Sequence, residues 1–155
     1  MALFENPTEA NLRVCAQMVE DVLGRRGVDL EKSRFDGAAG PGWKLRQGSA
    51  QLMVLLARGD GGPNTIQVMA PVLRATPAAL AGDRLPRRLL ELNATTLTQA
   101  AFGLRGDDVI LTTDRSTTGL DPVEVEEMIR RVADYADHYD DALVGEFGGQ
   151  RHSDL

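Results

Sequence analysis

The side chains best suited to chemistry form an acidic run near the C-terminus, in which Asp134, Asp137, Asp140 and Asp141 surround His138. Two pairs in this run are spaced by four residues, so a helix would turn two pairs of possible metal ligands to one side. A hard cation, however, usually takes oxygen ligands from more than one segment of a chain. We therefore predict that the run is the solvent-exposed face of an amphipathic helix and that no metal binds there.

The possible nucleophiles lack the setting that covalent catalysis needs. Cys15 falls on the apolar stripe of a predicted helix, whereas a reactive thiol needs an exposed, electropositive site and a nearby base. No serine stands in a Gly-x-Ser-x-Gly motif. The glycine-rich stretches at 37–42 and 59–62 lack the Lys-Ser/Thr that completes a phosphate-binding loop. We predict that the protein is not an enzyme and that it binds no cofactor.

Two motifs built on arginine are predicted to be structural. Arg-Gly-Asp occurs at 58–60 and again at 105–107, and in a chain without a secretion signal both are expected to be hairpin turns in which glycine supplies a positive φ. Arg84, Arg87 and Arg88 form a basic cluster. We expect these arginines to be solvated at a helix start, with contact to an acidic partner or RNA as the alternative.

Length, composition and charge indicate the class of protein. The chain has 155 residues, of which 43% are hydrophobic and 26% are charged, as in a globular protein that buries a core. The net charge is −6, whereas direct binding to DNA or RNA needs clustered Lys and Arg. We therefore expect no direct contact with nucleic acid and instead a protein partner that is either basic or nucleic-acid-handling.

The sequence does not predict export or membrane insertion. Its single cysteine excludes an intramolecular disulfide, and residues 1–7 lack the basic region and apolar stretch of a signal peptide. No apolar run approaches the roughly 18 residues that span a membrane. These features predict a cytoplasmic protein that makes no contact with a membrane.

Hydrophobic spacing and turn residues predict the order of secondary-structure elements. Helix-start motifs occur at 6–9 and 121–124, where an Asn or Asp precedes Pro. The predicted elements are a helix from 7 to about 23, a loop at 28–42 with room for a short strand at 33–35, strands at 43–47, 51–56 and 66–72, a helix from Pro86 to Asn93, a hairpin of 99–104 with 109–113, and a helix from 122 to about 144.

The segregation of helices and hairpins predicts the α+β class. We expect an antiparallel sheet of about five strands packed by three helices, in the order α-β-β-β-α-β-β-α. Leu89, Leu90 and Leu92 are expected to face inward from the short helix, and Trp43 to lie in the core. We predict one domain over residues 1–147 and a flexible polar tail over residues 148–155.

The chain resembles the YbjN-like bacterial proteins over nearly its whole length, on four features in order. Trp43 opens a strand that leads into the apolar strand 51–56, and the strand Ile66–Val72 follows. The most specific feature is Leu89-Leu90-Glu91-Leu92-Asn93 before Ala101-Phe102-Gly103-Leu104. The fourth is Leu120-Asp121-Pro122-Val123-Glu124-Val125 opening a long helix with Ala133-Asp134-Tyr135-Ala136-Asp137.

The resemblance implies a fold like that of type III secretion chaperones. It also implies a bacterial, cytoplasmic, non-enzymatic protein that forms a homodimer and holds a partner polypeptide. It supplies no catalytic residues, and Asn93 is interpreted as structural. We therefore expect a protein-binding adaptor or chaperone-like protein. Because members of the family are often described as sensory-transduction regulators, a regulatory or sensory module that binds a small ligand is the alternative.

The predicted binding surface is one face of the sheet. Because side chains alternate along a strand, two sets face opposite ways: Met53, Leu55, Met69 and Pro71 on one side, and Leu52, Val54, Val68 and Ala70 on the other. The long helix should cover one face, so we expect the first set to form a homodimer interface, a partner groove or both. Methionine at such a surface would adapt to varied partners.

Overall fold

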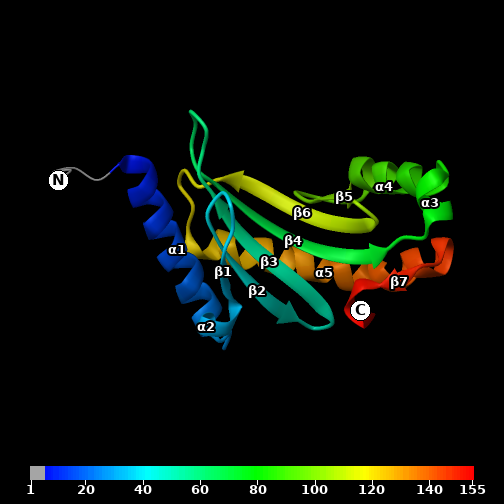
Figure 1. Cartoon of the computed structure of the whole chain (residues 1–155), viewed down its shortest axis with the longest axis horizontal. Helices are drawn as coiled ribbons and strands as arrows, with labels where there is room; N and C mark the ends of the chain where they lie inside the picture. Colours follow the sequence, from blue (N-terminus) through cyan, green and yellow to red (C-terminus); the bar gives the residue numbers. More distant parts are fainter. Residues whose placement is uncertain (1–5) are drawn as a thin grey trace. The chain divides into compact units, whose positions relative to one another are not determined.

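Residues 6–155 are described in the computed structural model of the protein, shown as a ribbon in Figure 1. The elements in chain order are α1 (Pro7–Arg25), α2 (Leu30–Ser33), β1 (Arg34–Asp36), β2 (Pro41–Gln47), β3 (Ala50–Ala57), β4 (Thr65–Arg74), α3 (Pro77–Ala81), α4 (Arg84–Thr95), β5 (Ala101–Arg105), β6 (Asp108–Ser116), α5 (Pro122–Phe147), β7 (Gln150–Arg151) and the 3-10 turn η1 (His152–Asp154). The prediction that residues 1–7 carry no signal peptide falls mostly outside the described residues.

The strands form one antiparallel sheet. Their order is β1-β2-β3-β4-β6-β5, and β7 pairs with the end of β4. The β1–β2 hairpin places Phe35 opposite Gly42, and the β5–β6 hairpin places Gly103 opposite Ile110. The predicted α+β class with an antiparallel sheet is confirmed, and every predicted helix and strand has a counterpart.

The chain divides into two compact units. Unit 1 comprises Met1–Leu45, Met53–Val68 and Asp114–Ile129, and unit 2 comprises Arg46–Leu52, Met69–Thr113 and Arg130–Leu155. Strands β2, β3, β4 and β6 and the helix α5 contribute residues to both units.

Helix α1 forms because its N-terminal capping residue and the spacing of its apolar residues both favour a helix. The Asn6 side chain accepts a hydrogen bond from the Thr8 N–H at 3.0 Å, and Pro7 occupies the first turn. One stripe of the helix faces the core of unit 1, and its buried members are Leu12, Cys15, Ala16, Val19, Val22 and Leu23. Trp43 lies fully buried in the same unit, as predicted.

Alternation along β3 separates a buried face from a half-buried one. Leu52, Val54 and Leu56 are buried, whereas Met53 and Leu55 between them remain half-buried. The half-buried side chains of Met53 and Leu55 form the open face of β3 in unit 1.

The structure adds two short helices and corrects one residue. Helices α2 and α3 are too short for a hydrophobic period, although the side chains of Asp29 and Thr76 cap them. Leu90 was predicted to face inward from α4, and this prediction is wrong, since 67% of it is exposed. The buried stripe of α4 is Leu85, Leu89 and Leu92, which leaves Leu90 on the outer side.

The C-terminal residues differ from the predicted polar tail. Gly148 and Gly149, with φ of 71° and 84°, turn the chain back so that β7 pairs with Leu73 and Arg74 of β4. A Cβ atom on Gly149 would lie 2.3 Å from the Arg74 carbonyl oxygen, so only glycine fits there. Residues 150–154 thus form β7 and η1.

Candidate functional site

Members of the acidic run on α5 form separate hydrogen bonds with neighbouring residues. Asp137 accepts a hydrogen bond from the Ser49 hydroxyl at 2.5 Å, and Asp134 accepts one from Arg130, four residues earlier, at 3.4 Å. No group of three His, Cys, Asp or Glu side chains among the described residues could hold a metal ion. The geometry therefore gives no support to a metal site in this run.

Asp140 is the buried member of the run, with 8% of its surface exposed. Burial raises the pKa of its carboxyl above the usual range, and the carboxylates of Asp141 and Asp137 raise it further. The hydrogen bond from the Asp141 N–H and the charge of Arg151 act in the opposite direction. A raised pKa in the folded state means that the charged form of Asp140 is unfavourable in the fold.

Replacing Asp140 with asparagine is expected to stabilise the protein more at about pH 7 than at about pH 4. Because the folded pKa is raised, the stability that Asp140 contributes is present below its unfolded pKa of about 3.9 and is lost as the pH rises through the folded pKa. Asparagine has no such loss. The melting temperatures of the two proteins should diverge with rising pH. A constant difference across this range, or the same divergence for Asp134→Asn, would contradict the assignment.

Cys15 and the second Arg-Gly-Asp motif have structural positions. Cys15 is buried, burial raises the pKa of its thiol, and its Sγ donates to Asn11 Oδ1 at 3.9 Å. Gly106 has a φ of 60° in the β5–β6 turn, as predicted for a hairpin. In the first motif the prediction is wrong, because Gly59 has no positive φ and the positive φ falls on Gly61, the residue after the motif. Gly59 is needed for space instead, because a Cβ atom there would lie 2.2 Å from the Gly62 carbonyl oxygen.

The basic cluster and Asn93 belong to the packing of α4 in unit 2. Arg88 pairs with Glu146 at 3.6 Å. The Asn93 side chain donates to the Phe102 carbonyl at 3.0 Å and accepts from the Phe102 N–H at 2.7 Å. Asn93 thereby replaces a neighbouring strand at the edge of β5, which is the physical reason for an asparagine before this strand.

A groove of about 490 Å³ lies in unit 1 between α1 and the edge strand β1. This volume is in the range of sites that bind ligands. α1 supplies one wall and β1 and the residues after it supply the other. The lining residues are Glu9, Leu12, Arg13, Ala16, Gln17 and Glu20 of α1, Arg34 and Asp36 of β1, and Gly37, Gly40, Pro41 and Arg58.

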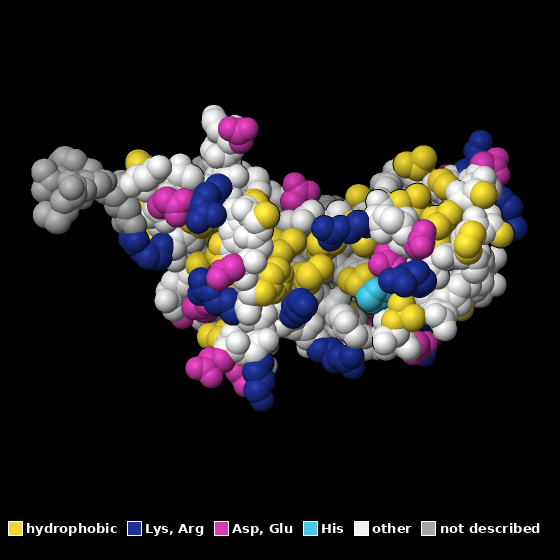
Figure 2. Space-filling model, in the orientation of Figure 1, with side chains coloured by type: hydrophobic (Ala, Val, Ile, Leu, Met, Phe, Trp, Pro, Cys, Tyr) yellow, Lys and Arg dark blue, Asp and Glu magenta, His cyan; other side chains and the backbone are white. Residues whose placement is uncertain are grey.

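Ion pairs connect the walls of this groove. Arg34 of β1 donates to Glu20 of α1 at 2.6 Å, and the same carboxylate oxygen accepts from the Trp43 indole at 3.2 Å. Arg58 donates two bonds to Glu9, of 2.5 and 3.3 Å. Side chains of both charges consequently lie side by side over α1 and β1 (Figure 2). Such exposed pairs add little stability, and their effect here is to position the walls.

The backbone of β1 has an open edge, and Asp36 of this strand lines the groove. Asp36 lies opposite Pro41, which has no N–H, and the next pair is closed by the Gly37 N–H donating to the Gly40 carbonyl at 2.8 Å. Hydrogen-bonded pairs alternate along an antiparallel ladder, so Asp36 turns its N–H and C=O away from β2. The backbone N–H of Arg34 also faces away from β2, because it donates to the Leu30 carbonyl. β1 also ends the strand order of the sheet. An open strand edge of this kind can pair with another extended chain.

Residues 16–155 match the family described as T3SS (YopN, CesT) and YbjN peptide-binding chaperone 1, TY-Chap1. The chain belongs to this family. The predicted resemblance to YbjN-like proteins and to type III secretion chaperones is thereby confirmed. No curated protein is significantly similar to the chain in sequence.

Two solved structures are similar in fold to the TY-Chap1 member. A chain of the ExsC–ExsE complex matches with a TM-score of 0.63 and 17% identity, over 90% of this chain and 97% of that one. A chain of the HopA1–SchA chaperone–effector complex matches with a TM-score of 0.60 and 11% identity, over 86% of this chain and 97% of that one. At these identities the similarity shows the fold alone.

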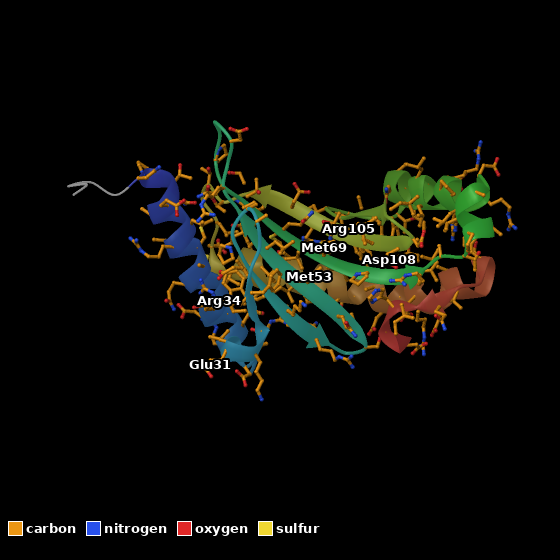
Figure 3. The ribbon with its side chains drawn as sticks, in the orientation of Figure 1. Glu31, Arg34, Met53, Met69, Arg105 and Asp108 are labelled. Atoms are coloured by element: carbon orange, nitrogen blue, oxygen red, sulfur yellow. The ribbon has the colours of Figure 1, made fainter. Side chains whose placement is uncertain are left out.

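The residues predicted as a binding surface fall into two pairs. In unit 1 of the TY-Chap1 member, Met53 and Leu55 are half-buried on the open face of β3, where Leu55 lies beside Phe35 against Gly42. In unit 2, Pro71 is half-buried, but Met69 is only 3% exposed. Arg105 lies beside Met69, with Nη1 3.7 Å from the sulfur (Figure 3).

Sequence reasoning missed the groove and two exposed leucines. The groove depends on the open edge of β1, a strand of three residues whose pairing the sequence does not reveal. In unit 2, Leu90 of α4 and Leu104 of β5 are 67% and 47% exposed, on two elements that Asn93 holds together. The spacing of Leu85, Leu89 and Leu92 could have indicated that Leu90 faces outward.

Proposed function

We propose that the protein is a chaperone that holds an extended segment of a partner polypeptide in the groove between α1 and β1 and that it catalyses no reaction. Membership in a peptide-binding chaperone family supports binding of a polypeptide. The observation that carries the proposal is the open edge of β1, because Asp36 offers an N–H and a C=O that an added strand could pair with.

We also propose that the protein is bacterial and acts in the cytoplasm. None of the described helices is long and apolar enough to cross a membrane.

Selection from a random library of peptides about twelve residues long on the immobilised full chain tests this function. A selected peptide should crosslink to a photoreactive residue placed at Gln17, which lines the groove. Val14 is the matched control, because it lies on the same helix and is exposed but does not line the groove. Absence of any selected peptide, or crosslinking at position 14 alone, would count against the proposal.

We propose further that the protein is a homodimer. Leu90 and Leu104 support one interface in unit 2, since large exposed apolar residues on adjacent elements are typical of contact surfaces. The open sheet faces at Met53 and Leu55 in unit 1 and at Met69 and Pro71 in unit 2 remain proposed partner or dimer surfaces. Because Met69 is buried beside Arg105, Leu55 is a better probe of these faces than Met69.

The Leu90→Asp variant is expected to be monomeric while keeping its fold. Leu90 is exposed in the single chain, so a carboxylate there costs the monomer little but would be desolvated in an interface. Sedimentation equilibrium should give half the wild-type mass. Val123→Asp is the control, because Val123 is similarly exposed on another element, and it should keep the wild-type mass. A monomeric wild type, or a dimeric Leu90→Asp variant, would contradict this interface.

A further inference from the structure

The groove is lined by three cationic and three anionic side chains, which are Arg13, Arg34 and Arg58, and Glu9, Glu20 and Asp36. Glu9 pairs with Arg58 and Glu20 pairs with Arg34. Asp36 forms no hydrogen bond or ion pair through its side chain with any of the residues 6–155, and its side chain is exposed to solvent at the groove. A strand added to β1 would therefore meet a carboxylate that has no ion-pair partner among the described residues.

The geometry of β1 places this carboxylate toward α1. Phe35 lies on the opposite face, because its ring occupies the space above Gly42, where a Cβ atom would come within 2.4 Å of the ring. Side chains alternate along a strand, so Arg34 and Asp36 share the face that lines the groove. The guanidinium of Arg34 lies 5.7 Å from the centre of the buried Trp43 ring, which agrees with this orientation.

An added strand would bring one of its own side chains next to Asp36. Residues directly opposite each other on paired strands point to the same face with Cβ atoms about 5 Å apart, and opposite charges at such positions attract. The floor beside them is apolar or small, with Leu12, Ala16 and Pro41. The side chain opposite Asp36 would thus combine an aliphatic stem on this floor with a charged end at the carboxylate, which describes Lys or Arg.

We propose, on the basis of the proposed function, that the partner segment is an extended strand that places a Lys or Arg residue opposite Asp36. This residue sets the register of the segment in the groove. The partner is therefore basic at this point, and the acidic net charge of the chain favours the same sign of partner.

A charge exchange tests the proposal. Peptides selected on the wild-type chain from the random library should share a Lys or Arg at one aligned position. Replacing that residue with Glu in a selected peptide should weaken binding about three- to tenfold, as measured by fluorescence anisotropy. Selection on Asp36→Lys should enrich Asp or Glu at the same position, and selection on Asp36→Asn should show no charge preference. Asp114→Lys, which changes an exposed carboxylate outside the groove, should select the wild-type sequences.

The outcomes separate this proposal from the function on which it rests. Peptides that bind and crosslink at Gln17 but show no basic preference, or keep it on Asp36→Lys, would overturn the basic residue and leave the chaperone function intact. Failure to select any peptide on the folded wild-type chain would overturn both.

Discussion

Replacement of Asn64 by alanine is expected to lower the free energy of unfolding by about 3 kcal/mol, a large fraction of the stability of a domain of this size. Asn64 is only 3% exposed. Its amide donates to the Thr8 carbonyl at 2.8 Å and to Asn11 Oδ1 at 3.0 Å, and its carbonyl oxygen accepts from the Gly59 N–H at 3.1 Å. Alanine would leave these three groups without that partner, and unpaired buried polar groups cost roughly 1–3 kcal/mol each.

The network around Asn64 also connects the start of α1 to two other segments of unit 1. The Thr117 hydroxyl, itself buried, donates to Asn11 Oδ1 at 2.8 Å, and the Thr117 N–H donates to the backbone carbonyl of Asn64 at 2.9 Å. Because α1 is a wall of the groove, the Asn64→Ala variant should also bind peptide less tightly. The measurement is urea unfolding followed by circular dichroism. Thr65→Ala, at the exposed neighbouring position, should change the unfolding free energy by less than about 0.5 kcal/mol. Equal effects of the two substitutions would contradict the network.

The Asp36→Pro variant is expected to keep its fold and to lose at least about tenfold in peptide affinity. Proline removes the N–H that faces away from β2 and leaves the β1–β2 pairing unchanged, because Asp36 makes no ladder bond there. Proline is accepted in sheets on edge strands whose N–H faces solvent, where it prevents further strand pairing. The peptide carbonyl that would accept a hydrogen bond from the Asp36 N–H would then have no donor.

Two controls separate the backbone of residue 36 from its charge. Asp36→Asn keeps the N–H and should weaken binding only as far as the lost charge does. The thermal unfolding of Asp36→Pro should stay close to that of Asp36→Asn, which shows that the edge strand remains formed. Wild-type affinity in Asp36→Pro would mean that peptides bind without adding a strand to β1.

The hydrophobic pattern predicts the helices and strands that are long enough to show a period. The shortest elements show no such pattern, because their position depends on pairing. Helix α1 has a capping Asn6 and a buried stripe that both appear in the sequence, and the extended α5 follows from Asp121-Pro122 in the same way. The sequence left room for a short strand at 33–35, where β1 forms, but it did not predict the helices α2 and α3. These three elements span only three to five residues, too few to show a period. Their place is decided by tertiary contacts such as the pairing of Phe35 with Gly42.

The binding surface and the groove could be predicted only in part, because some of their features depend on contacts between distant residues. Alternation along β3 separates Met53 and Leu55 from their buried neighbours Leu52, Val54 and Leu56, because this alternation depends on the strand alone. Met69 is buried and contacts Arg105, which is 36 residues away, and sequence spacing does not predict this contact. The open edge of β1 depends on Pro41 lying opposite Asp36, and that pairing becomes visible only in the folded hairpin.

Residue-resolved amide hydrogen exchange, measured by NMR with and without a selected peptide, tests the central claim most directly. β1 and β5 end the strand order, and Asp36 and Leu104 are their outward-facing residues, since the Phe102 groups two positions earlier are bound by Asn93. Our account predicts that peptide at about ten times its Kd slows exchange of the Asp36 amide about tenfold and leaves Leu104 unchanged. Slowing at Leu104 and none at Asp36 would show that the partner segment binds elsewhere and would contradict the account.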